Sequence, residues 1–351
     1  MVPKRNSVKK TLFNLGRIAI TGVLLFILVV PASRFVSSKF PLVKLAGLST
    51  ILRGVLPGYV IPAACLSLFG ICLLTWRWQI ILSREQLPFV FLLRLTFIGL
   101  FFNNFLPTGA GGDAVKGYYF LKDKERKLDL GLSIVIDRLI GSLSIMSLGF
   151  IAVMIRFPYI SRPSAYAIII LFLAVLAFFL LIAWQGLGRL TGRLVCLLPW
   201  KRGTHEVDRG EGLRRLYYGF HNYIQDTRSF FCALLVSYVT QILAIFANYL
   251  VALGLRASIP LISFLVAIPL IWASTTVPSL GGLGVRETGY LFFFQNQMGR
   301  ENAFGLALIM LAFSFFNSLI GAIVYFVGLR GQPLKIGGIK CLKTDCVTSE
   351  N

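Results

Sequence analysis

Two short stretches, each beginning with a proline, decide how this sequence folds: Pro107-Thr-Gly-Ala-Gly-Gly-Asp-Ala-Val-Lys116 and Pro278-Ser-Leu-Gly-Gly-Leu-Gly-Val-Arg-Glu287. We call them the first and second glycine segments. Each closes a long apolar run and contains a Gly-Gly pair, followed by one acidic and one basic side chain. A proline ends a helix by removing an amide donor, and glycines let the backbone turn without steric cost. Both segments therefore predict broken membrane helices, which mark substrate sites in transporters built from repeats.

The composition places the chain in a lipid bilayer. Of its 351 residues, 56% are hydrophobic and 14% are charged, and the mean hydropathy is +0.78. These values are far from those of soluble globular proteins. The net charge of +21 comes from basic residues that cluster between apolar runs, the pattern of loops beside anionic lipid. We therefore expect a membrane partner and no nucleic acid.

Cysteine and histidine give no sign of a metal or redox site. The six cysteines form no CxxC pair, and both histidines, His205 and His221, fall in one basic loop. The cysteines are interpreted as small apolar packing residues. We expect no metal and no cofactor.

The apolar runs predict an all-α polytopic membrane protein, because about 20 residues are needed to cross the bilayer core. Six full spans are expected, at 12–31, 55–75, 128–155, 164–184, 229–254 and 302–329. The runs at 88–106 and 258–277 end at the prolines of the glycine segments and are expected to form two broken re-entrant hairpins. Residues 1–329 would form one transmembrane domain, with a cytoplasmic amphipathic loop at 185–228 and a polar, disordered tail at 330–351. Trp76-Arg77-Trp78 is interpreted as an anchor at the membrane surface.

This count of spans places the basic loops mostly on one side. With both termini on that side, its loops hold 25 of the 35 Lys and Arg residues and the opposite side holds seven. The positive-inside rule makes the majority side cytoplasmic, in a bacterial inner membrane. The basic residues between 32 and 54 fit this arrangement poorly. Three full spans separate the hairpins, which would open from opposite faces as an inverted repeat suited to alternating access.

The glycine segments are expected to bind an anion. Free amides at the start of a returning half-helix and the helix dipole favour negative charge, and Lys116 and Arg286 add full positive charges. Asp113 and Glu287 would neutralise these bases in the empty state or take up protons. The alternative is that the glycines only permit close helix packing and that each charge pair is a local lock.

Further polar residues lie within the apolar spans. Asp137 and Arg138 begin about 13 Å into the span that starts at Leu128, so at least one of them should face the protein interior. Asp113 is the first candidate partner for Arg138. Neutral amides are expected to form interhelical hydrogen bonds, with cavity lining as the alternative: Asn103, Asn104, Gln241, Asn248 and Asn317.

These residues resemble those of a known family. Asn103 and Pro107 with Gly111-Gly112-Asp113 and Lys116, then Asp137-Arg138, then Pro278 with Gly281-Gly282, Gly284 and Glu287, resemble the lysylphosphatidylglycerol synthase transmembrane family. The resemblance covers about residues 12 to 329 and implies a flippase-like protein that translocates lipids with charged or sugar head groups. Because about 22 residues follow Leu329, the aminoacyl-transfer domain of its best-known members is not expected.

The sequence thus predicts a translocase for an anionic or phosphate-linked lipid rather than an enzyme, since it lacks a GxSxG elbow, a P-loop and HExxH. No residue is assigned a catalytic role. A lipid-synthesis enzyme is a candidate partner. The alternatives are a membrane enzyme or accessory subunit in glycolipid or polyprenyl-phosphate sugar assembly and a secondary transporter for a soluble anion. The candidate substrate-binding residues are Asn103, Pro107, Gly111, Gly112, Asp113, Lys116, Asp137, Arg138, Pro278, Gly281, Gly282, Gly284, Arg286 and Glu287.

Overall fold

The computed structural model describes residues 54–83, 87–105, 111–120, 127–156, 162–183, 223, 226–275 and 283–330. Within these ranges the chain forms nine α-helices and no strand, which confirms the all-α prediction. The predicted span at 12–31, most of the loop at 185–228 and nearly all of the tail at 330–351 lie outside the described residues. That residues 1–329 form one domain stays a prediction.

Five long helices match five of the six predicted full spans. They are α3 (Pro57–Ile81), α6 (Lys127–Arg156), α7 (Arg162–Ala183), α10 (Thr227–Gly254) and α13 (Arg300–Arg330). Each is long and apolar enough to cross a membrane. Local chemistry sets some of their ends: α3 has Pro57 in its first turn, and the Asp226 carboxylate before α10 accepts a hydrogen bond from the Ser229 amide at 3.4 Å.

Four shorter helices flank the two glycine segments. Helix α4 (Phe89–Phe105) precedes the first segment, and α5 (Gly111–Phe120) begins within it. Helix α11 (Leu261–Ser274) precedes the second segment, and α12 (Val285–Met298) begins within it. At 1.5 Å per residue, even the longest of these, α4, reaches only about 25 Å, less than a bilayer core of about 30 Å. None of the four can cross as an ordinary upright span.

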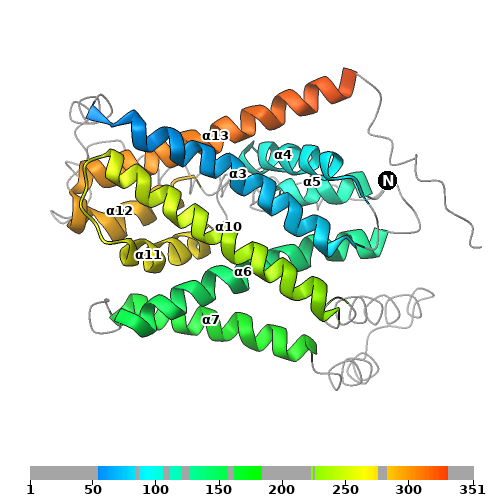
Figure 1. Ribbon diagram of the computed structural model, residues 1–351, viewed down its shortest axis with the longest axis horizontal. Coiled ribbons are helices and arrows are strands. Elements are labelled where there is room, and N and C mark those ends of the chain that lie inside the picture. The colour runs from blue at the N-terminus through cyan, green and yellow to red at the C-terminus, as the bar shows by residue number, and fades with distance from the viewer. Residues whose placement is uncertain are drawn as a thin grey trace, which may run out of the picture.

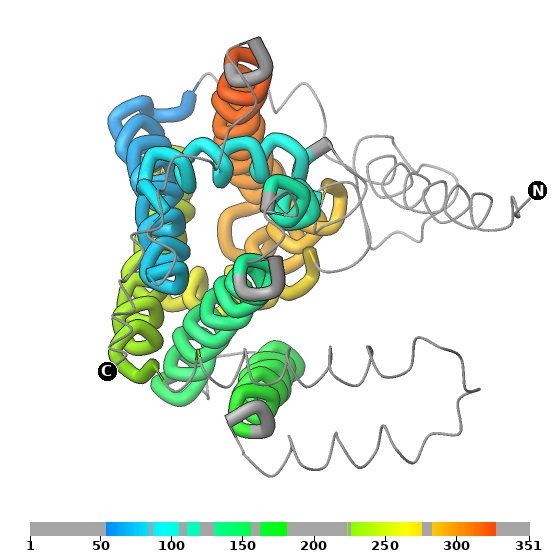
Figure 2. Tube along the Cα trace, turned by 90° about the vertical axis from the view of Figure 1, so that its right-hand side faces the viewer, coloured from blue at the N-terminus to red at the C-terminus, as the bar shows by residue number. Residues whose placement is uncertain are grey.

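The two short pairs lie toward opposite ends of the molecule. In Figure 1, α4 and α5 lie in the half that contains the last turns of α13, and α11 and α12 in the half where α13 begins. Helix α13 packs against both α4 and α12. Helix α3 runs antiparallel beside α10, and the Leu56 amide donates to the Gly254 carbonyl at 3.0 Å. Figure 2 shows these two helices together, with α7 on the far side of α6.

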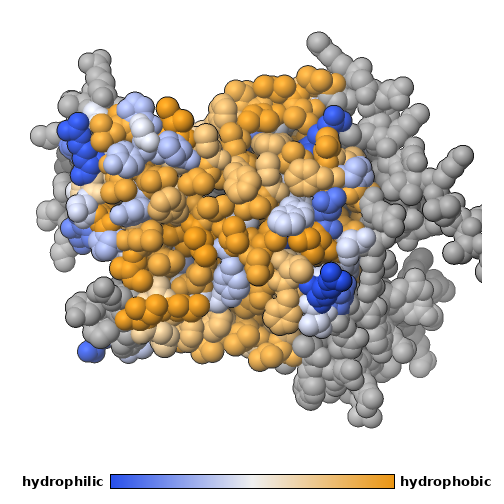
Figure 3. Space-filling model, viewed as in Figure 1, coloured by the Kyte–Doolittle hydropathy of each residue, from blue (hydrophilic) through white to orange (hydrophobic). Residues whose placement is uncertain are grey.

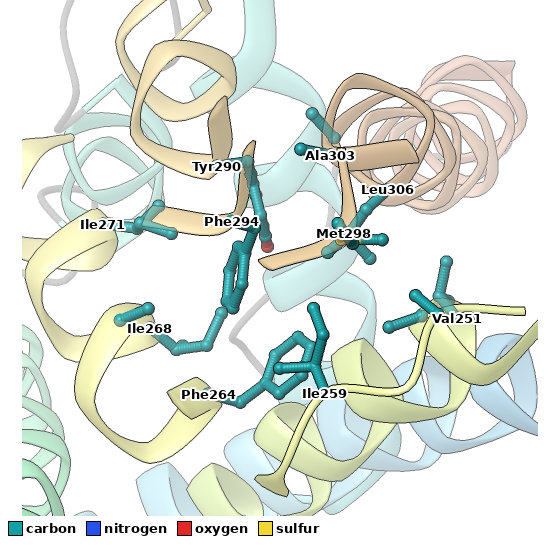
Figure 4. Close-up of a cluster of buried hydrophobic side chains, with 14 of the residues drawn as sticks. Val251, Ile259, Phe264, Ile268, Ile271, Tyr290, Phe294, Met298, Ala303 and Leu306 are labelled. Carbon is teal, nitrogen blue, oxygen red and sulfur yellow. The ribbon is translucent and has the colours of Figure 1, made fainter. Parts of the chain in front are cut away.

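The largest buried cluster surrounds the second short pair. Phe264 of α11 and Phe294 of α12 are fully buried, and their rings stack with centroids 4.6 Å apart. Tyr290 lies one turn from Phe294 and faces the same cluster, together with Val251 from α10 and Leu306 from α13 (Figure 4). Helix α12 is therefore held in the protein interior on several sides.

The outer surface is strongly apolar. The side chains of Ile155, Ile170, Leu235 and Val327 are each more than 60% exposed. Figure 3 shows hydrophobic residues across the middle of one face, with hydrophilic residues gathered toward the two ends. A water-soluble monomer does not expose apolar surface on this scale. The protein is a multi-pass membrane protein.

Candidate functional site

A buried ion pair joins three of the long helices. The Arg77 guanidinium of α3 donates from Nε to the Asp137 carboxylate of α6 at 2.7 Å and from Nη1 to the Ser237 hydroxyl of α10 at 2.8 Å. The Arg77 side chain is only 3% exposed. Gly141 leaves room for it, because a Cβ there would lie 3.1 Å from the guanidinium. The carboxylate of Asp137, a candidate binding residue, thus forms an ion pair with Arg77 inside the protein.

The surface anchor expected at Trp76-Arg77-Trp78 is wrong for two of its three residues. Helix α3 continues to Ile81, so all three lie within it. Trp78 is 2% exposed and donates from its indole to the Ser133 hydroxyl at 3.2 Å, while Trp76 is 49% exposed. The apolar run of the sequence ends at residue 75, whereas the helix continues beyond Arg77 to Ile81. The apolar residues of α3 follow no helical periodicity, so no pattern in the sequence indicates that Arg77 faces inward.

The predicted partnership of Arg138 and Asp113 is confirmed. The Arg138 Nε donates to the Asp113 carboxylate at 2.8 Å and links α6 to α5. Arg138 lies about 12 Å into the apolar span that begins at Leu130, yet its side chain is 49% exposed. A charge this open is costly against hydrocarbon. The surface beside this ion pair is therefore suited to water or to a polar head group.

Lys116 has no acidic partner among the described residues. Its ammonium lies 4.5 Å from the centre of the Trp78 ring, a cation–π contact. Its charged neighbours include Asp113 and Asp137, but these carboxylates form ion pairs with Arg138 and Arg77. The side chain also packs on Gly99 of α4, where a Cβ would lie 2.9 Å from Lys116 Cε. The first glycine segment thus keeps a cation that no described carboxylate pairs with.

The glycines of the first segment hold two helices together. Gly111 and Gly112 are buried at the start of α5. A Cβ at Gly112 would overlap the backbone carbonyl of Gly99 in α4. This contact supports the packing alternative for Gly112. Pro107 lies outside the described residues.

The second glycine segment is described from residue 283 onward, so Pro278, Gly281 and Gly282 lie outside the described residues. Gly284 has φ 81° and forms the N-cap of α12. One Glu287 carboxylate oxygen accepts from the Gly284 amide at 2.7 Å, and the other accepts from the Arg286 guanidinium at 3.2 Å. Glu287 is 1% exposed. Arg286 and Glu287 are therefore paired with each other in the first turn of α12.

Three of the intramembrane amides form interhelical hydrogen bonds, as predicted. Asn104 donates to the Ser318 hydroxyl of α13 at 2.6 Å, Asn317 donates to Ser67 of α3 at 3.2 Å, and Asn248 accepts from the Tyr290 hydroxyl at 2.6 Å. Asn103 differs, because its buried Oδ1 has no hydrogen-bond partner in the part of the chain that the structure describes. Unsatisfied buried acceptors are rare and call for an explanation.

These features define a class: a multi-pass α-helical membrane protein with paired short helices and a charged cluster within its spans. The model of the family described as the lysylphosphatidylglycerol synthase TM region matches residues 14–321. The chain belongs to this family, so the resemblance seen in the sequence is confirmed. Comparisons with curated proteins and with solved structures gave no significant match.

Proposed function

We propose that this protein moves a lipid with an anionic or phosphate-linked head group between the leaflets of the membrane. The observation that carries the proposal is Lys116, a cation within the helical bundle whose neighbouring carboxylates are engaged elsewhere. An uncompensated charge away from water is unfavourable, and a phosphate would supply the missing negative charge. Membership of a membrane-domain family agrees with a lipid as the ligand.

The head group would lie between Lys116 and Arg138. Arg138 is half exposed and holds Asp113, which belongs to α5. A phosphate that approaches Arg138 competes with the Asp113 carboxylate for the same donors, so binding would loosen α5 from α6. The unpartnered Asn103 oxygen would accept a hydrogen bond from a hydroxyl of a sugar or glycerol head group.

The paired short helices would supply the moving parts. We infer that α4 with α5 and α11 with α12 are re-entrant hairpins that enter from opposite faces of the membrane. Their lengths and their placement toward opposite ends of the molecule support this inference. Irregular backbone at membrane depth is tolerated only where it is buried in protein or lines a cavity. Two inverted hairpins would then give a lipid head group alternating access.

Transport would leave the lipid chemically unchanged, whereas an enzyme of glycolipid assembly would alter it. The experiment uses the purified protein in liposomes that contain head-group-labelled phosphatidylglycerol. A membrane-impermeant quencher reports how fast the label moves between leaflets, and chromatography of the recovered lipid reports any chemical change. We expect faster leaflet exchange than in protein-free liposomes and an unaltered lipid. An altered lipid, or exchange no faster than without protein, would reject the proposal.

A further inference from the structure

On the basis of the proposed transport of an anionic lipid, we propose that the head-group phosphate binds Lys116 of α5 and does not bind Arg286 of α12. Arg286 and Glu287 of the second segment instead hold α12 in place. The sequence gives the two segments the same ingredients, a Gly-Gly pair with one acid and one base. In the folded protein their charges are used differently.

The first segment belongs to a cluster with an excess of positive charge. Among the described residues, Arg77, Lys116 and Arg138 contribute three cations, and Asp113 and Asp137 contribute two carboxylates. Each carboxylate accepts from an arginine at 2.7–2.8 Å. The excess of one positive charge is therefore located on Lys116. A head group with one negative charge, such as a phosphodiester, matches this excess.

The second segment has no such excess. Arg286 and Glu287 cancel each other, and both Glu287 oxygens are occupied, one by Arg286 and one by the Gly284 amide. The latter bond satisfies an amide that the start of α12 would otherwise leave without a partner. A phosphate placed here would have to displace a carboxylate that is almost fully buried. This pair is built to cap and orient a helix.

The charged pair of the first segment is also more accessible than that of the second. The first segment's ion pair is open, with the Arg138 side chain 49% exposed, whereas Arg286 is 21% and Glu287 2% exposed. Helix α12 also presents Tyr290 and Phe294 to the largest buried cluster (Figure 4). A displacement of α12 by a ligand would disturb that cluster. Helix α5 is tied to its neighbours by the Gly99 contact and by a half-exposed ion pair.

The test measures lipid retention and thermal stability on the same samples. The full-length protein is purified in micelles containing equal amounts of phosphatidylglycerol and zwitterionic phosphatidylcholine, and native mass spectrometry counts the retained lipids. Lys116→Gln should lower phosphatidylglycerol retention at least tenfold with little loss of stability. Arg286→Gln should lower the melting temperature while its folded fraction retains phosphatidylglycerol within about twofold of the unmodified protein. Arg228→Gln, which removes an exposed arginine at the start of α10, is the matched control.

A double variant keeps the proposal testable if Arg286→Gln fails to fold. In Arg286→Gln with Glu287→Gln no unpaired charge remains, and the glutamine oxygen can still accept from the Gly284 amide. We expect this variant to recover stability and to retain phosphatidylglycerol normally. Loss of retention in the folded double variant, or normal retention in Lys116→Gln, would overturn the one-sided site. If the unmodified protein retains phosphatidylglycerol no better than phosphatidylcholine, the proposed function itself is rejected.

Discussion

Asp137 and Arg138 are neighbours in the sequence, but they have different partners and different surroundings. Asp137 faces inward to Arg77, and Arg138 lies half exposed beside Asp113. Adjacent residues on a helix point about 100° apart, so one cannot turn inward without turning the other away. The buried pair thereby orients the open one. We infer that Arg77, through Asp137, fixes the orientation of Arg138.

Removing one partner of the buried pair should be costly. Asp137→Asn leaves the Arg77 charge inside the protein without a carboxylate, and we expect a loss of about 3–5 kcal/mol in the free energy of unfolding. Replacing both residues, as Arg77→Met with Asp137→Leu, should recover most of this loss because no buried charge remains. Denaturation of the detergent-solubilised protein measures both. A single variant as stable as the unmodified protein would show that the pair is not structural.

Some of the charged contacts could be predicted from the sequence and others could not. The Arg138–Asp113 pair was predictable because a charge inside an apolar span needs a partner and few acids are available. Arg77 was missed because hydropathy does not mark where a helix ends beyond its apolar run. The lack of a described carboxylate partner for Lys116 was not predictable, because it depends on which carboxylate pairs with each arginine in the folded protein.

At the scale of helices, α4 is the element to which two others come unusually close. Gly112 of α5 meets the Gly99 backbone, and Gly321 of α13 meets the Phe97 carbonyl. A glycine on one side of each contact lets the helix backbones approach within a membrane, where apolar burial alone gives little preference for protein over lipid. The helix breaks could be predicted from the prolines, but the role of Gly112 in packing could not be separated from a role in binding by sequence alone.

Gly112→Ala tests the packing role. The added methyl group would overlap the Gly99 carbonyl, so the backbones of α4 and α5 must separate, and we expect a loss of about 1–3 kcal/mol in the free energy of unfolding. Gly117→Ala, on the same helix, is the control, because a Cβ there has no atom within 4 Å. It should be neutral or slightly stabilising. Equal stability of the two variants would show that the contact of Gly112 with Gly99 does not stabilise the protein.

At the scale of the whole molecule, the order of long and short helices follows the predicted order of spans and hairpins over the described residues. That order was predictable because a proline and a Gly-Gly pair follow the two apolar runs that form short helices. The orientation in the membrane rests on the basic residues. With Arg77 inside α3 and Lys116 inside the helical bundle, 23 Lys and Arg residues remain on the proposed cytoplasmic side against seven opposite.

Cysteine labelling checks this orientation. In a variant without the native cysteines, His205→Cys should react with an impermeant reagent only from the cytoplasmic side. Glu301→Cys, an exposed position at the start of α13, should react only from the outer side. Both termini should lie with residue 205. Labelling of both cysteines from the same side would contradict opposite entry of the two hairpins.

Leaflet exchange in the Lys116 variants tests whether this cation carries the lipid head group. Labelled phosphatidylglycerol is followed in liposomes that contain equal amounts of folded unmodified protein, Lys116→Arg or Lys116→Gln. Because a headgroup phosphate needs the positive charge and not the lysine itself, Lys116→Arg should keep most of the exchange rate. Lys116→Gln should lose at least tenfold. Exchange by Lys116→Gln at the rate of the unmodified protein would show that this cation does not carry the head group and would contradict the account.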